Sequence, residues 1–201
     1  MLFRSSTLTI GANGGAGSFA GSLMNTGSSF LSLTKIGTGT SVLSGISSYT
    51  GTTSLNAGVL SVTNGRALGF STLVLNGGLL DRSGVANLQL GNLTGSSPWD
   101  LLGLSTTIFN GSGTFGGSLV DTVGGGRFAV TGGTFSVGGG AVTYTGTTFV
   151  PAGTLALVNP STFASSAVVT GNTANFGGAG GGTLRFDVAG SFAYDSPISG
   201  R

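Results

Sequence analysis

The chain has 201 residues, only 6% of them charged, and its formal net charge is +2 at pH 7. Glycine occupies 41 positions, about three times its ordinary share. The few Lys and Arg residues are scattered singly, which excludes the clustered basic surface that nucleic-acid binding needs. With no Cys and no His, the chain also lacks the residues for disulfides and for thiolate or imidazole metal sites.

The apolar content predicts a folded chain. Leu, Ile, Val and Phe together exceed the roughly 20% below which disorder is expected. No apolar run approaches the roughly 18 residues that span a bilayer, so no membrane span is expected. Residues 1–6 lack the apolar core of a signal peptide, and we therefore expect an exported form of this chain to be a fragment or a processed segment.

Short predicted strands follow one another along the whole chain, each marked by two apolar residues separated by one residue. They are Leu8 and Ile10, Leu31 and Leu33, Leu60 and Val62, Leu73 and Leu75, Leu88 and Leu90, Phe128 and Val130, Phe135 and Val137, Val142 and Tyr144, Leu155 and Leu157, and Leu184 and Phe186. Turns rich in glycine separate them, such as 76–78, 131–133 and 171–172. The chain has no Glu, one Lys and no sustained 3.6-residue apolar period, so we predict an all-β fold.

Strand spacing alone fits either a sandwich of hairpins or a solenoid of stacked coils. A sandwich would need charged outer faces to protect its edges. The outward positions here are mostly Ser, Thr, Gly and Asn, which suit ladders of like residues stacked about 4.8 Å apart. The pattern therefore favours the β-solenoid.

One segment, residues 33–62, resembles the autotransporter-associated β-strand repeat. The positions that match are Thr34, Lys35, Gly37, Gly39, Thr40, Leu43, Ser44, Gly45, Tyr49, Thr50, Gly51, Thr53, Asn56, Ala57, Gly58, Leu60 and Val62. Ser41 departs from the pattern where an inward Leu is usual, and Ser47 replaces a common Asn. The resemblance implies a right-handed parallel β-helix, the β-solenoid of autotransporter passengers.

The resemblance covers about residues 7–82, including a lead-in and a continuation around the segment. Beyond residue 95 the likeness fades into a Gly- and Phe-rich region that keeps the alternation without the letters of the repeat. We therefore expect a repeat solenoid over 1–95, a loop or change of coil shape over 96–104, and a less regular continuation over 105–201.

Glycines of the segment are expected at coil corners, at Gly37, Gly45, Gly51 and Gly58, because glycine reaches backbone angles that other residues adopt only at a cost. Asn56 is expected either to bond along the axis to an Asn of a neighbouring coil or to be a solvated turn residue.

Two further positions of the segment carry side chains with alternative roles. We expect Tyr49 to be packed with its hydroxyl at the rim; the alternative is an exposed ring that stacks on a sugar. Lys35 is expected to be a solvated corner residue, or else to pair with an Asp of an adjacent coil.

The residues for catalysis are scarce. Without His, Cys and Glu, only the carboxylates Asp81, Asp100, Asp121, Asp187 and Asp195 remain, single and irregularly spaced, as turn residues are. The Gly runs 124–126 and 180–182 lack the Asp of nonapeptide calcium repeats. We predict no catalytic residue, no cofactor and no metal site, and hence no enzyme.

Trp99, the only Trp, lies off the repeat. It is the candidate ligand-binding residue, for contact with a glycan; a packing or capping role is the alternative.

The predicted function is that of a structural or adhesive segment of an autotransporter-type passenger, on the bacterial outer surface or in the extracellular space. Cell-surface glycans, or other copies bound through the solenoid ends, are the expected partners. The alternatives are a self-assembling extracellular fibre subunit and, third, a carbohydrate-active β-helix enzyme.

Overall fold

The computed structural model describes residues 6–108, 111–160, 162–164, 167–170, 181–190, 194 and 196–200. Within these residues the chain consists of strands and one short 3-10 turn, η1 (Ala12–Gly14), with no α-helix. The chain forms two compact units, unit 1 (residues 1–93) and unit 2 (residues 94–201). The predicted turn at 171–172 lies outside the described residues.

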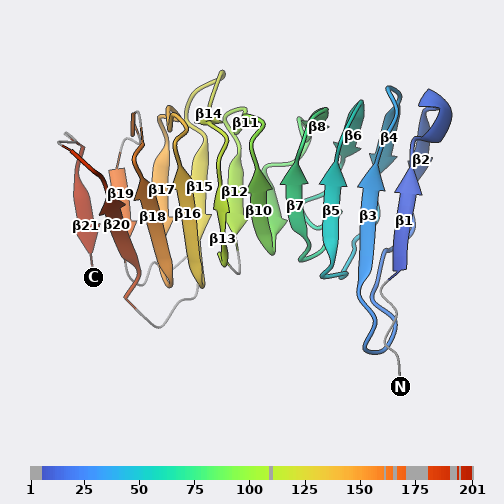
Figure 1. Cartoon of the computed structure of the whole chain (residues 1–201), viewed down its shortest axis with the longest axis horizontal. Helices are drawn as coiled ribbons and strands as arrows, with labels where there is room; N and C mark the ends of the chain where they lie inside the picture. The colour runs from blue at the N-terminus through green and yellow to red at the C-terminus, as the bar shows by residue number, and fades with distance from the viewer. Residues whose placement is uncertain are drawn as a thin grey trace. The chain divides into compact units, whose positions relative to one another are not determined.

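Unit 1 is a stack of coils that contributes strands to two parallel ladders (Figure 1). The first ladder contains β1 (Ser6–Ile10), β3 (Leu31–Lys35), β5 (Thr52–Leu55) and β7 (Thr72–Leu75), and the second contains β2 (Gly17–Phe19), β4 (Thr40–Leu43), β6 (Val59–Val62) and β8 (Leu79–Asp81); β9 (Asn87–Leu90) follows them. Each step between ladder partners advances the chain by 20 residues, from Leu33 to Thr53 and from Thr53 to Leu73. The coil is therefore about 20 residues long.

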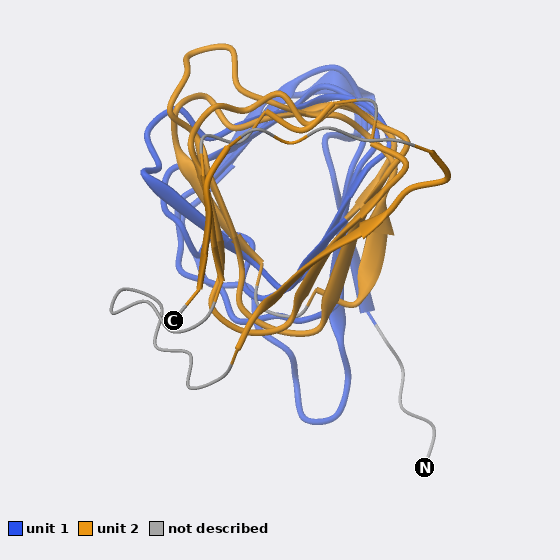
Figure 2. Cartoon of the chain, turned by 90° about the vertical axis from the view of Figure 1, so that its left-hand side faces the viewer, with its two compact units in different colours: residues 1–93 blue, residues 94–201 orange. Residues whose placement is uncertain are grey.

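Unit 2 repeats this arrangement with its own parallel ladders. Its strands are β11 (Trp99–Asp100) with β14 (Leu119–Val120); β13 (Gly113–Phe115), β16 (Thr134–Gly138), β18 (Thr154–Val158) and β20 (Thr183–Asp187); and β12 (Ser105–Ile108), β15 (Arg127–Val130), β17 (Thr147–Val150), β19 (Ala167–Thr170) and β21 (Ile198–Gly200). A further strand, β10 (Asn92–Gly95), spans residues of both units. Figure 2 shows the chain of each unit winding around an interior. The predicted all-β, parallel β-solenoid is confirmed.

The alternation of side chains explains why these segments are strands. In β3, β5 and β7, Leu33, Thr53 and Leu73 are stacked in register and fully buried, while the residues between them face outward. The same column pattern fills the interior of unit 2 with aromatic rings: Phe128 packs on Phe135 with ring centroids 5.4 Å apart. A buried Leu or Phe contributes about 1.5–3 kcal/mol, so the stacked columns hold each unit together.

The predicted strand at Val142 and Tyr144 is wrong. Both side chains are buried, as the alternation indicated, but Val142 forms only isolated parallel bridges to Leu119 and Phe163. Glycines at 138–140 and at 146 flank this segment and interrupt regular pairing on both sides. The burial was predictable here, whereas the ladder was not.

Segment 96–104 contains a strand as well as a turn. Its residues Trp99 and Asp100 form β11 and pair in parallel with Leu119 and Val120 of β14. A turn with positive φ at Leu102 (52°) and Gly103 (69°) follows directly.

The corner glycines are required for two different reasons. Gly37 and Gly58 have positive φ, 67° and 68°, as a left-handed corner requires. Gly45 and Gly51 do not, but a Cβ there would overlap the backbone carbonyls of Gly21 and Leu31 in the preceding coil. The prediction that all four supply special backbone angles is therefore correct for two, and close coil-to-coil approach explains the other two.

Candidate functional site

A line of hydroxyl groups crosses the apolar interior of unit 1. The Tyr49 hydroxyl lies 2.6 Å from Thr53 Oγ1, which lies 2.7 Å from Ser71 Oγ. All three side chains are fully buried. Burial raises the pKa of Tyr49, and the hydrogen bonds from Thr53 and Ser71 oppose this effect. Tyr49 is thus packed, as predicted, but its hydroxyl lies in the interior and not at the rim.

The same arrangement is present in unit 2. Tyr144 and Thr148 are buried, and their hydroxyl oxygens lie 2.5 Å apart, again four residues apart in the sequence. Tyr144 also packs against Phe128, with ring centroids 6.3 Å apart. Each unit therefore carries a buried Tyr bonded to the Thr that begins the next inward position.

Lys35 is buried, contrary to the expectation of a solvated residue. It occupies an inward column, in register with Ile10 of β1 and Leu55 of β5, so its methylene stem lies in the interior. The ammonium group Nζ donates to the carbonyl oxygens of Ile36, Gly37 and Ala57 at 2.7, 3.0 and 3.3 Å.

The partners of Lys35 tie two coils together. The Ile36 and Gly37 carbonyls belong to its own corner, whereas Ala57 belongs to the corner of the next coil. Three charge-assisted hydrogen bonds satisfy the ammonium group, which explains how a cation is accommodated in an inward column. Lys35 therefore acts as a clip between corners.

Polar side chains also bond along the axis of the stack at the surface of unit 1. Asn76 Nδ2 donates to Asn56 Oδ1 at 2.9 Å, so the predicted Asn ladder is confirmed. Ser61 Oγ donates to Asp81 Oδ2 at 2.9 Å, and the backbone N–H of Ser83 donates to Asp81 Oδ1 at 3.1 Å. These bonds, the backbone one first, hold the pKa of Asp81 below its usual value.

Asp100 and Asp121 close the same turn in unit 2. Asp100 accepts hydrogen bonds from the backbone N–H of Leu102 and from both the N–H and the hydroxyl of Thr122, the latter at 2.6 Å. Asp121 accepts from the N–H groups of Gly103 and Gly126 at 2.7 and 2.5 Å. The sequence gave these carboxylates as isolated, but their separation of 21 residues is close to one coil and brings them to neighbouring turns.

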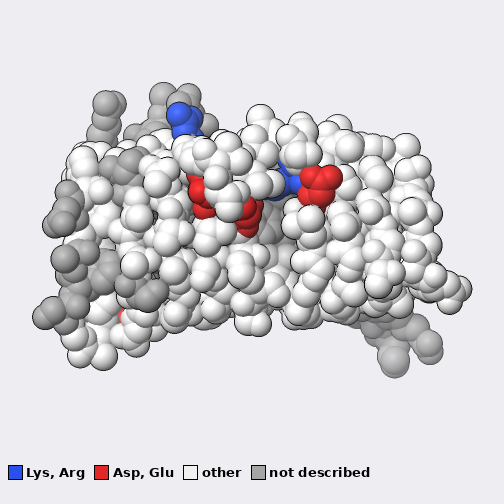
Figure 3. Space-filling model, turned by 90° about the horizontal axis from the view of Figure 1, so that it is seen from above, with Lys and Arg blue, Asp and Glu red and all other residues white. Residues whose placement is uncertain are grey.

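The remaining carboxylates lie apart from this turn. Asp187 forms an exposed ion pair with Arg185, with 2.8 Å between Arg185 Nη2 and Asp187 Oδ2. Asp195 lies outside the described residues. In the part of the chain that the structure describes, no three acidic residues gather as metal ligands would. The face in Figure 3 is formed almost entirely by uncharged residues.

Trp99, the candidate ligand-binding residue, is only 3% exposed. It begins β11 and lies in register with Leu119 of β14. A ring in this position offers no free face for stacking against a sugar.

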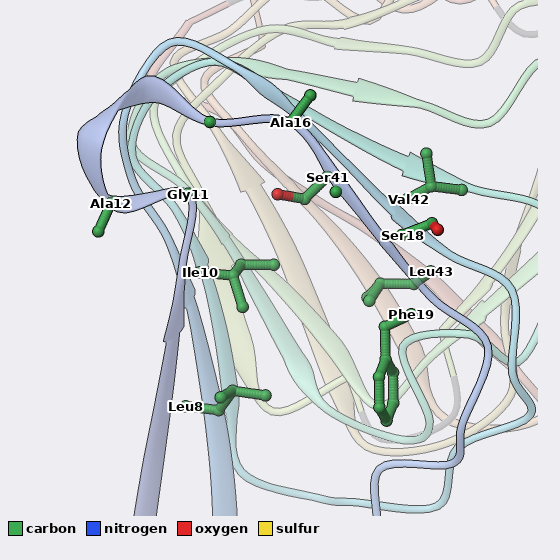
Figure 4. A pocket seen from close by; sticks show the side chains of 12 residues that line it. Leu8, Ile10, Gly11, Ala12, Ala16, Ser18, Phe19, Ser41, Val42 and Leu43 are labelled. Atoms are coloured by element: carbon green, nitrogen blue, oxygen red, sulfur yellow. The ribbon is translucent and has the colours of Figure 1, made fainter.

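An apolar pocket of about 460 Å³ opens in unit 1 at strands β1 and β2 (Figure 4). Its walls include Leu8, Ile10, Phe19 and Leu43, and Ser41 lies at its floor. Sequence reasoning noted Ser41 as a departure from the repeat but missed the pocket.

Small side chains in one inward column produce this pocket. Gly17, Ser41, Leu60 and Leu80 are stacked in register, so the column is filled by leucine in the later coils and left open in the first two. The pattern was available in the sequence, because the repeat has an inward Leu where Ser41 stands.

Among the described residues, no helix has the length and apolar character to cross a membrane.

Comparison with known proteins identifies the repeat. The family model of the passenger-associated-transport-repeat matches residues 33–62 and 124–157. No curated protein and no solved structure matches the chain.

The second match corrects the expectation that the repeat's letters are lost beyond residue 95. Residues 144–148 read Tyr-Thr-Gly-Thr-Thr, identical to residues 49–53, and Ala152-Gly153 recurs at the distance that Ala57-Gly58 has in the first repeat. This identity was the signal that could have revealed it. The chain therefore carries the passenger-associated-transport-repeat, once in each of its two compact units.

Proposed function

We propose that this chain is a structural stalk segment of an autotransporter passenger, displayed on the bacterial outer surface. One observation carries the proposal: both repeats form coils whose conserved-looking features are spent on stacking. Lys35, the Tyr49 hydroxyl and Asn56 each bond within the coil stack. The repeat and the parallel β-solenoid fit a passenger segment, and the stalk role is the part that needs testing.

Burial of the aromatic side chains supports a stalk over a glycan-binding surface. Protein surfaces that bind sugars present flat aromatic rings, whereas Trp99, Tyr49 and Tyr144 are buried here. A glycan-binding screen with the purified chain tests this directly. We expect no specific binding; a hit that Trp99→Ala removes without unfolding the chain would restore the adhesive hypothesis.

We also propose that the chain is not catalytic. The carboxylates of Asp100 and Asp121 are engaged by backbone N–H groups of a turn, as structural aspartates are. Polysaccharide cleavage that Asp100→Asn or Asp121→Asn abolishes, with the fold retained by circular dichroism, would overturn this part of the proposal.

Surface display tests the stalk role itself. The chain would be placed between an outer-membrane anchor and an N-terminal epitope, and the epitope measured on intact cells with an antibody. We expect a strong signal and a stalk that resists added protease. The matched control is Gly58→Val, which prevents the corner from closing: its epitope should be lost to protease. An epitope that stays inaccessible with the wild-type stalk, or is equally protected with both stalks, would contradict the proposal.

A further inference from the structure

We propose that the β1 end of unit 1 is a self-association surface, which joins two copies of the chain through antiparallel pairing of their β1 strands. The proposal concerns one end of the coil stack and goes beyond the stalk role, which does not require it.

The outer edge of β1 has free backbone groups at known positions. Ser6 N–H donates to Phe30 O at 3.1 Å, and Ile10 O accepts from Ile36 N–H at 3.0 Å, so these residues bond toward β3. Because alternate residues of a strand point their N–H and C=O groups to opposite sides, Thr7 and Thr9 point theirs away from β3. No strand in the described part of the chain pairs with that edge.

The side chains at this end are also incompletely covered. Leu8 is 38% exposed, whereas its ladder partner Leu33 is fully buried. Phe19 is 43% exposed, whereas its partner Leu43 is 4% exposed. The pocket behind Ser41 opens between these two side chains (Figure 4). A strand added beside β1 would bury them as the next coil does elsewhere.

Charge favours a second copy as the occupant. Edge strands of soluble proteins are usually protected by charges or Pro, but residues 6–34 contain no charged residue and no Pro. Two copies of this end therefore meet without charge repulsion. The opposite end differs, since β20 carries the exposed Arg185–Asp187 ion pair and Pro197 precedes β21. Pressing that pair against the uncharged β1 end would desolvate both charges, which disfavours head-to-tail stacking.

The pairing follows from the alternation of β1. A two-fold axis at Leu8 places Thr7 of one copy opposite Thr9 of the other, and both residues have their N–H and C=O groups on the free edge. These two Thr pairs exchange hydrogen bonds, and Leu8 faces its own counterpart in a non-hydrogen-bonded pair, the closer of the two kinds. Each Leu8 then covers the pocket of the partner. Such an interface uses the same patch on both copies, so it closes as a dimer and does not propagate into a fibre.

Cysteine cross-linking tests the pairing at its centre. The natural chain has no Cys, and facing residues of a non-hydrogen-bonded pair have the separation that a disulfide requires. We expect Leu8→Cys to form a disulfide-linked dimer under mild oxidation. Ile198→Cys, on the exposed face of the opposite end strand, is the matched control and should remain monomeric. Dimers of the control alone would overturn the proposal.

Sedimentation velocity separates the possible assemblies without a disulfide. We expect dimers of the wild-type chain, with a Kd raised at least about tenfold by Leu8→Lys and unchanged by Ile198→Lys. Thr9→Pro removes a donor that points to the free edge, so it should weaken the dimer while preserving the coil. Loss of assembly in both Lys variants would show head-to-tail stacking, and a wild-type chain that is monomeric at roughly 100 μM would exclude an interface of useful strength; either result overturns the proposal.

Discussion

The hydroxyl oxygens of Tyr49 and Thr53 lie 2.6 Å apart in the interior of unit 1, and Thr53 also bonds to Ser71. Thr53 is thus the central member of a buried line of three hydroxyls. Because a buried polar group left without a partner costs more than a lost bond contributes, the central member should matter most.

We therefore expect Thr53→Val to destabilise the chain by about 3 kcal/mol and Tyr49→Phe by about 1 kcal/mol. The first change leaves the hydroxyls of Tyr49 and Ser71 without Thr53, whereas the second leaves the Thr53–Ser71 bond intact. Urea unfolding monitored by circular dichroism measures both free energies of unfolding. Equal effects of the two substitutions would show that the line does not act as a connected network.

Base should weaken unit 1 through Tyr49. Burial raises the pKa of this residue above the ordinary value of 10.0, so above that pH the unfolded chain releases the proton first. Stability from the neutral buried phenol is then fully present below pH 10 and declines as pH rises toward the folded pKa. The stability difference between wild type and Tyr49→Phe should accordingly shrink above pH 10. A difference that stays constant to about pH 12 would contradict this account.

Lys35 offers a chemical measure of unfolding, because it is the only lysine and its side chain is buried. In the native chain we expect an amine-reactive ester to label the N-terminal amine rapidly and Lys35 slowly, with Lys35 becoming reactive in urea. Peptide mass spectrometry resolves the two sites, and the N-terminal amine serves as the internal control. Rapid labelling of Lys35 in the folded chain would place its ammonium group in solvent.

Two glycines with the same backbone angle separate strain from collision. Gly27 and Gly58 have φ of 59° and 68°, but a Cβ at Gly27 meets nothing within 4 Å, whereas at Gly58 it overlaps the carbonyl oxygen of Gly37. We expect Gly27→Ala to cost about 1 kcal/mol from left-handed strain alone. Gly58→Ala should cost on the order of 4 kcal/mol.

Thermal unfolding of both Gly variants measures the difference. Similar melting temperatures for Gly27→Ala and Gly58→Ala would mean that the corner relaxes around a methyl group, and the close approach of coils at Gly37 and Gly58 would then not be a constraint.

Features that depend on alternation were predictable from the sequence. Leu33 and Leu73 point inward because apolar residues recur at every second position, and the Asn56 ladder follows from stacking like residues. The repeat itself was recognisable over 33–62 because its glycines and its Tyr-Thr-Gly fall at fixed distances.

Features that depend on which coil lies next were not predictable. Lys35 looks like a surface residue until the carbonyl of Ala57 is placed beside its ammonium group. Asp100 and Asp121 look isolated until the coil length brings them to one turn. The pocket at Ser41 similarly arises from Gly17 in the neighbouring coil.

The 20-residue step of unit 1, from Leu33 to Thr53, also has a mechanical consequence. A load that pulls the terminal coil away from the stack acts on one ladder at a time, because each coil is bonded only to its neighbours. Releasing one coil would lengthen the tether by about 65 Å, so such a segment yields in small increments under tension and shields whatever it carries from sudden force.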